Sequence, residues 1–259
     1  MTDLLWRSGY TFAIGALVWV VHKYVDVYPA ALPKSANPAR NIRSALFLWG
    51  LALIFSILLM VWISPHLERM VTNRVLIQLI QVPIRSIPYI FIPLFLVIRR
   101  QGWGMKDVGL TLENKSWSIT VFALLVGLGS GAIAYITGYT NLSIQLLGWG
   151  ELILLIYNNS FLEEYYYRGV IQSLLERAVG QRMAILFGGI LFGMTHIYLD
   201  VSVLMEKGGV LTIFSAILLQ IMAGWIFGII YMKTRSLWPG IACHYMANWL
   251  PSILVNLAC

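Results

Sequence analysis

A short charged stretch, Glu163-Glu164-Tyr165-Tyr166-Tyr167-Arg168, lies inside a chain that is otherwise rich in apolar residues. A charged side chain at membrane depth costs roughly 2.5–3.5 kcal/mol on insertion scales, so a cluster of ionisable groups there indicates a functional site. On a helix, Glu164 and Arg168 share a face and can neutralise each other as a supporting pair. Glu163 is turned about 100° away from that face and keeps its carboxylate without this partner.

Glu163 is therefore the candidate for chemistry in this stretch. A glutamate that is shielded from water can serve as a general base near neutral pH. The alternative interpretation is structural: the three charged side chains form a buried ion-pair network, or they cap a helix at the membrane interface.

Two later apolar segments each carry polar side chains of the kind that assists hydrolysis. His196 is the ionisable residue of its segment, and His244 and Asn248 are spaced four residues apart, on one face of a helix. A single buried histidine is often only a packing residue, so neither segment is informative alone. Because all of these residues fall in neighbouring membrane-spanning segments, we expect Glu163, His196, His244 and Asn248 to form one site.

Two chemistries suit such a set. In the first, Glu163 and His196 position and deprotonate a water molecule that attacks a peptide carbonyl. His244 and Asn248 then donate hydrogen bonds to the oxyanion, a contribution of about 3–4 kcal/mol per donor. In the second, Glu163, His196 and His244 hold a zinc ion with an open water position. We favour the version without a cofactor, because the sequence has no HExxH helix and asparagine is a poor zinc ligand.

Three motifs in this order resemble those of the CPBP family, the CAAX-processing and bacteriocin-processing (Abi-type) intramembrane proteases. The motifs are Glu163-Glu164-x-x-x-Arg168-Gly169, Phe192-x-x-x-His196 and His244-x-x-x-Asn248. The resemblance covers about residues 105–257 and implies an all-helical membrane fold with the site inside the bundle. It also implies that Glu163 and His196 activate water while His244 and Asn248 stabilise the oxyanion. The family has been described both as metalloproteases and as metal-independent glutamate proteases, so the resemblance leaves zinc open.

The composition indicates a membrane protein. Of the 259 residues, 59% are hydrophobic and 11% are charged, whereas a soluble domain is about a quarter charged. The net charge of +7 does not indicate nucleic-acid binding, because the lysines and arginines lie in short loops between apolar runs. The two cysteines, Cys243 and Cys259, provide neither a disulfide framework nor a zinc ribbon.

Apolar runs predict an all-α, polytopic transmembrane helix bundle of about eight spans, judged against the roughly 20 residues that cross a bilayer. The runs cover about residues 9–27, 44–63, 75–98, 117–138, 150–177, 183–199, 210–232 and 237–257. The first run is the weakest, and if it does not cross there are seven spans. The third contains Pro83, Pro88 and Pro93 and should be kinked. The polar connector 99–116 suggests an accessory part, residues 1–100, and a catalytic core, residues 101–259.

Loop charges predict the orientation. Thirteen lysines and arginines fall in the loops that include residues 22–43, 99–115, 168–182 and 233–235, and four fall in the opposite loops. The positive-inside rule places the first set in the cytoplasm of a multi-pass protein of the cytoplasmic (plasma) membrane. Pairs of glycines four residues apart predict close helix packing. The pairs are Gly127 and Gly131, Gly189 and Gly193, and Gly224 and Gly228.

Other candidates are weaker. Cys243 is turned about 100° from His244, which argues against a cysteine nucleophile. Arg85 is expected to meet a buried acceptor or water, with a substrate carboxylate or a lipid headgroup as the alternative. Tyr165 to Tyr167 are expected to pack between helices rather than to line a substrate groove.

The sequence thus predicts an intramembrane endopeptidase that cleaves a membrane-associated or lipidated protein or peptide within the lipid bilayer. One alternative is a non-catalytic immunity or scaffold protein of the same fold. Another is a small proton-coupled transporter, which should show inverted repeats and broken helices that the sequence lacks.

Overall fold

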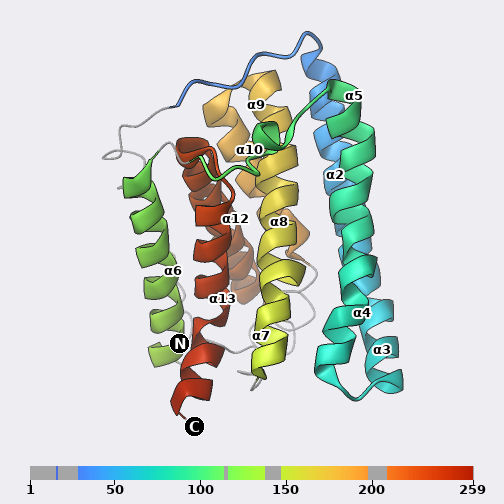
Figure 1. Cartoon of the computed structure of the whole chain (residues 1–259), viewed down its shortest axis with the longest axis vertical. Coiled ribbons are helices and arrows are strands. Elements are labelled where there is room, and N and C mark those ends of the chain that lie inside the picture. The colour runs from blue at the N-terminus through green and yellow to red at the C-terminus, as the bar shows by residue number, and fades with distance from the viewer. Residues whose placement is uncertain (1–15, 17–28, 114–115, 138–146, 198–208, 259) are drawn as a thin grey trace.

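The described part of the chain is an all-α bundle (Figure 1), as the sequence predicts. The computed structural model describes residue 16 and residues 29–113, 116–137, 147–197 and 209–258, and no strand occurs among them. The first predicted span, residues 9–27, lies almost wholly outside these residues. Within the described ranges, three helices are long and apolar enough to cross a membrane, namely Pro38–Met70, Arg74–Gln101 and Ile213–Thr234.

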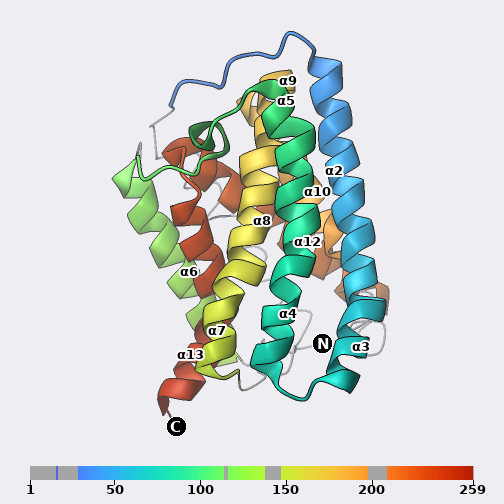
Figure 2. The ribbon, with the colours of Figure 1, turned by 45° about the vertical axis from the view of Figure 1, so that its right-hand side comes forward.

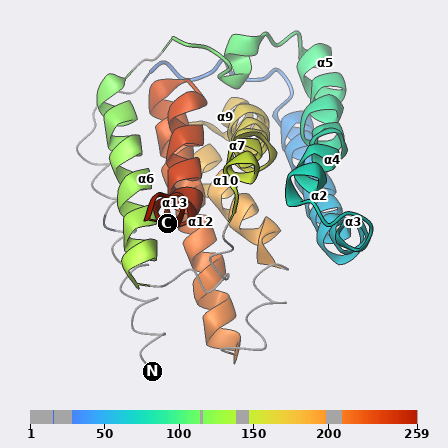
Figure 3. The same ribbon diagram turned by 60° about the horizontal axis from the view of Figure 1, so that its bottom comes forward.

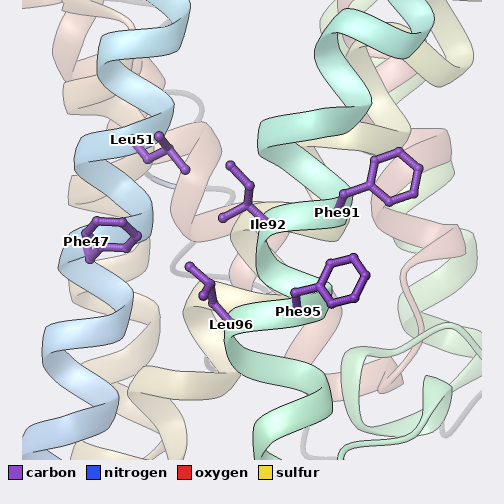
Figure 4. Close-up of a pocket in the computed structure, with 6 residues that line it drawn as sticks. All are labelled: Phe47, Leu51, Phe91, Ile92, Phe95 and Leu96. Atoms are coloured by element: carbon purple, nitrogen blue, oxygen red, sulfur yellow. The ribbon is translucent and has the colours of Figure 1, made fainter.

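The first two of these helices form an antiparallel hairpin. The first consists of α2 (Pro38–Leu58), η1 (Leu59–Ile63) and α3 (Ser64–Met70), and the second of α4 (Arg74–Ser86), η2 (Ile87–Phe91), η3 (Leu94–Ile98) and α5 (Arg99–Gln101). Each begins at an asparagine, Asn37 or Asn73, whose side chain accepts a backbone N–H of the first turn. Where the sequence has Pro88 and Pro93, this helix contains two π-helical segments, η2 and η3. An apolar groove runs between α2 and these segments (Figure 4).

A long central helix carries the acidic pair. It consists of α7 (Trp149–Leu155), η5 (Ile156–Phe161), α8 (Leu162–Glu164), η6 (Tyr165–Gln172) and α9 (Ser173–Val179), without interruption. Every residue from Leu162 to Arg177 is buried. Figure 3 shows this helix between the α2–α4 hairpin and the pair of α6 (Trp117–Thr137) and α13 (Trp238–Ala258). The predicted span 150–177 is confirmed as a helix.

The remaining helices pack in two close pairs. α10 (Gln181–Thr195) lies against α12 (Gly209–Thr234), and α6 lies against α13 (Figure 2). A Cβ added at Gly193 would come within 2.7 Å of the Ile221 backbone nitrogen, and one at Gly131 within 2.5 Å of the Met246 carbonyl oxygen. The glycines therefore let the backbones approach, as predicted.

Several loops meet at one end of the bundle. Glu176, near the end of α9, accepts two hydrogen bonds from the Arg235 guanidinium at 2.7 and 2.8 Å. It also accepts the Leu32 backbone N–H at 2.9 Å. Arg177 binds Asp107 of the polar connector at 2.7 Å. The four basic loops that the sequence places on one side of the membrane thus lie together.

Arg168 is an exception to that assignment. The sequence groups it with these loops, but it lies within η6 and is 0% exposed. Its charge belongs to the interior of the bundle and not to a loop. Without Arg168, the loops at this end still carry more basic residues than the loops at the opposite end.

Candidate functional site

Three predicted site residues meet at one oxygen of Glu163. Glu163 Oε2 lies 3.8 Å from His196 Nε2 and 3.9 Å from His244 Nε2. This oxygen is buried and has no hydrogen-bond partner among the described residues. The other oxygen, Oε1, accepts a hydrogen bond of 2.9 Å from the side chain of Asn159. One oxygen of Glu163 therefore accepts a hydrogen bond, and the other lies near both histidines without a hydrogen-bond donor.

Both histidines are held by their Nδ1 atoms. His196 Nδ1 is 2.8 Å from the Phe192 carbonyl oxygen, and His244 Nδ1 is 3.0 Å from Glu164 Oε1. Because a carbonyl or carboxylate oxygen only accepts, these partners assign the proton to Nδ1 in each neutral ring. Each Nε2 then carries a lone pair and lies within 4 Å of Glu163 Oε2. A proton, a water molecule or a cation shared by these three atoms would satisfy their lone pairs.

Glu164 connects Arg168 to His244. Glu164 Oε2 lies 3.3 Å from Arg168 Nε, and both side chains are fully buried. The two groups form an ion pair but not a hydrogen bond. The Arg168 guanidinium also lies 4.7 Å from the centre of the Phe192 ring. The predicted Glu164–Arg168 pair is confirmed. The bond from Glu164 to His244 was missed, because it joins residues 80 positions apart.

Asn248 reaches the site through Asn159. Asn248 Nδ2 donates to Asn159 Oδ1 at 3.2 Å, and Asn159 in turn donates to Glu163. The Asn248 side chain is exposed, unlike that of His244 one turn earlier on α13. Sequence reasoning overlooked Asn159. The available signal was its polar side chain in an apolar run, four residues before Glu163 and so near the same helix face.

One helix boundary differs from its expected position. The run 183–199 was expected to be one helix, but α10 ends at Thr195 and His196 is its C-cap, with φ −89° and ψ −5°. Residues 198–199 of that run lie outside the described residues. On α13, Pro239 lies in the first turn, where proline is tolerated. A Cβ added at Gly240 would lie 3.3 Å from Glu164 Oε2, so α13 enters the bundle at the level of the acidic pair.

The weaker candidates have structural roles. Arg85 Nη1 donates to the Asn158 carbonyl oxygen, which is the buried acceptor that was expected. Cys243 is a buried free thiol, while the neighbouring His244 is bound to Glu164. Tyr165, Tyr166 and Tyr167 are buried among the helices, in agreement with the packing interpretation.

The zinc alternative depends on the same three side chains. Among the described residues, no group of three or more His, Cys, Asp or Glu side chains has the spacing of a metal site. The ligand types do fit zinc, since a carboxylate oxygen of Glu163 lies within 4 Å of Nε2 of His196 and of Nε2 of His244. Each histidine is also oriented through Nδ1, as zinc-binding histidines are.

Residues 145–250 match the family model described as type II CAAX prenyl endopeptidase Rce1-like. The matched interval contains the acidic pair, His196, His244, Asn159 and Asn248. The match confirms the resemblance to CAAX-processing proteases that the three motifs predicted, and it supports a CAAX-type membrane protease. No curated protein and no solved structure matches the chain.

Proposed function

We propose that the protein is an intramembrane endopeptidase that hydrolyses a peptide bond in a membrane-associated or lipidated protein or peptide. The observation that carries the proposal is the approach of His196 Nε2 and His244 Nε2 to one unpartnered oxygen of Glu163. The family match over residues 145–250 supports the class of reaction.

Glu163 and His196 would activate the water. A water molecule between Glu163 Oε2 and His196 Nε2 donates its hydrogens to both and directs a lone pair at the substrate carbonyl. As its oxygen bonds to the carbonyl carbon, one proton moves to Glu163 and the carbonyl becomes an oxyanion. When the carbon–nitrogen bond breaks, Glu163 returns that proton to the leaving amine.

His244 and Asn248 would stabilise the oxyanion. Asn248 Nδ2 has two hydrogens, and its bond to Asn159 uses one of them. His244 can donate from Nε2 when that atom is also protonated, and Glu164 then stabilises the imidazolium through Nδ1. A bound zinc ion, held by Glu163, His196 and His244, would instead supply Lewis-acid activation of water.

The test is cleavage in proteoliposomes by the wild-type protein, Glu163→Gln and His196→Ala. Each peptide of a substrate panel is tested with and without an attached lipid. One set of reactions is treated with a chelator, and zinc is then added back. Asn256→Asp serves as the matched control, because Asn256 lies on α13 and its amide donates to the Leu147 carbonyl oxygen, away from the site.

We expect the wild-type protein and the control to cleave a lipidated peptide. Loss of the general base should lower kcat by about 10²- to 10⁴-fold. Glu163→Gln protein that is folded and cleaves as fast as the wild type would refute the assignment of Glu163. Activity that the chelator removes and zinc restores would favour the zinc form.

A further inference from the structure

Asn159 is hydrogen-bonded both to a residue proposed to activate water and to a residue proposed to stabilise the oxyanion. Its Nδ2 donates to Glu163 Oε1 at 2.9 Å, and its Oδ1 accepts from Asn248 Nδ2 at 3.2 Å. Glu163 is the residue proposed to activate water, and Asn248 is the residue proposed to stabilise the oxyanion. A single amide side chain therefore contacts both.

The chemistry of these partners allows only one orientation of the amide. An ionised carboxylate only accepts hydrogen bonds, so the Asn159 NH2 group must face Glu163. The Asn159 oxygen then faces Asn248 and must meet the NH2 group of that residue. If Asn248 turned its amide over, two carbonyl oxygens would oppose each other.

We propose that Asn159 is a positioning residue that orients both Glu163 and Asn248 for peptide hydrolysis. By occupying Glu163 Oε1, it leaves Oε2 directed at the two histidines. By accepting one Asn248 hydrogen, it directs the second N–H of that amide to the substrate oxygen. This role depends on the proposed function, whereas the hydrogen-bond chain itself can be tested without a substrate.

The hydrogen bond between Asn159 and Glu163 is tested by exchanging which of the two residues donates and which accepts. Thermal unfolding in detergent is compared for the wild type, Asn159→Asp, Glu163→Gln and the double variant. Asn159→Asp sets two carboxylates against each other and should lower Tm. Adding Glu163→Gln restores a donor opposite an acceptor, so the double variant should recover most of the loss.

The control pair is Asn256→Asp, alone and combined with Glu163→Gln. Asn256 does not touch Glu163, so the effects of these two changes on Tm should add. If Asn159→Asp and Glu163→Gln also combine additively, the hydrogen bond between the two residues is absent and the proposal fails.

The positioning role is tested on the cleaved substrate. Asn159→Leu keeps a similar volume without polar atoms and should lower kcat by about 10- to 100-fold, while KM changes less than about threefold. Combining it with Asn248→Ala should reduce kcat little further than the worse single change, because the two residues act as a unit. Wild-type kcat in folded Asn159→Leu protein would overturn the role.

The two proposals can fail separately. If the wild type cleaves no peptide on the panel while the exchange of donor and acceptor restores Tm, the proposed function fails and the Asn159 contacts stand. If the wild type cleaves and Asn159→Leu cleaves equally well, the proposed function stands and the positioning role is wrong.

Discussion

Glu163 and Glu164 are adjacent carboxylates with different surroundings. Glu164 is fully buried and faces Arg168 and His244, both of which can balance its charge. Glu163 has a single hydrogen-bond donor, Asn159, and its second oxygen is without one among the described residues. Glu164 is thus placed to stabilise the fold, and Glu163 has an oxygen without a protein donor, as its proposed role in water activation requires.

This difference predicts unequal effects on stability. Glu164→Ala leaves the buried Arg168 guanidinium without its carboxylate and should cost about 3–5 kcal/mol of unfolding free energy. Glu163→Ala removes one oxygen that lacks a donor and one that accepts a hydrogen bond from Asn159, so it should cost less, about 1 kcal/mol. Thermal or denaturant unfolding of both variants in one detergent measures the difference. Equal losses would contradict the division of roles.

At the residue scale, sequence spacing predicted the contact within one helix and the set of residues that lie together, but it did not predict individual hydrogen bonds between helices. The Glu164–Arg168 pair follows from two residues four positions apart in a helical segment. The bonds from Glu164 to His244 and from Asn248 to Asn159 depend on the rotation and depth of α13 relative to the central helix. No local pattern determines those two quantities.

At the scale of elements, α6 holds α13, and therefore His244 and Asn248, at the correct distance. A Cβ at Gly131 would lie 2.5 Å from the Met246 carbonyl oxygen, midway between those two site residues. Gly129 lies on the same helix, and nothing is within 4 Å of a Cβ placed there. These two glycines form a natural pair for comparison.

Gly131→Ala should separate the α6 and α13 backbones and cost about 1–3 kcal/mol of stability, as overpacking does. It should also lower kcat, because it moves the helix that carries His244 and Asn248, the proposed oxyanion donors. Gly129→Ala should leave stability and activity near wild-type values. Unfolding and cleavage assays of both variants test this, and similar behaviour of the two would show that helix contact does not determine the effect.

Element boundaries were predictable where composition changes sharply. The central helix and the helices after residue 209 end close to the predicted positions, since loops of basic and small residues bound them. The π-helical segments η5 and η6 on either side of α8 were not predicted. They differ from α-helix in hydrogen-bond register and not in residue pattern, although such segments are frequent at functional sites.

At the scale of the whole molecule, the two ends differ in charge. The segment 29–37, the connector, the end of α9 and the turn between α12 and α13 lie at one end, and the turn between α3 and α4 lies at the other (Figure 1). The sequence anticipated this grouping because basic loops alternate with loops that have few charges.

Cysteine labelling tests the orientation. Ala36 and Thr72 are both exposed, so each is replaced by cysteine in a chain that carries Cys259→Ser. A reagent that cannot cross the bilayer should label Ala36→Cys only from the cytoplasmic side of sealed vesicles, and Thr72→Cys only from the opposite side. The reverse pattern would show that the positive-inside rule gives the wrong orientation for this chain.

The order of the site residues along the chain has a consequence for biosynthesis. The acidic pair lies on the central helix, whereas His244 and Asn248 lie on α13, which leaves the ribosome after the central helix. Until α13 inserts, Glu164 has Arg168 but lacks His244, and neither Asn159 nor Glu163 has its full set of neighbours. A nascent chain can therefore acquire much of the helix bundle before it acquires all of the site residues, and the proposed peptidase activity would begin only after α13 has inserted.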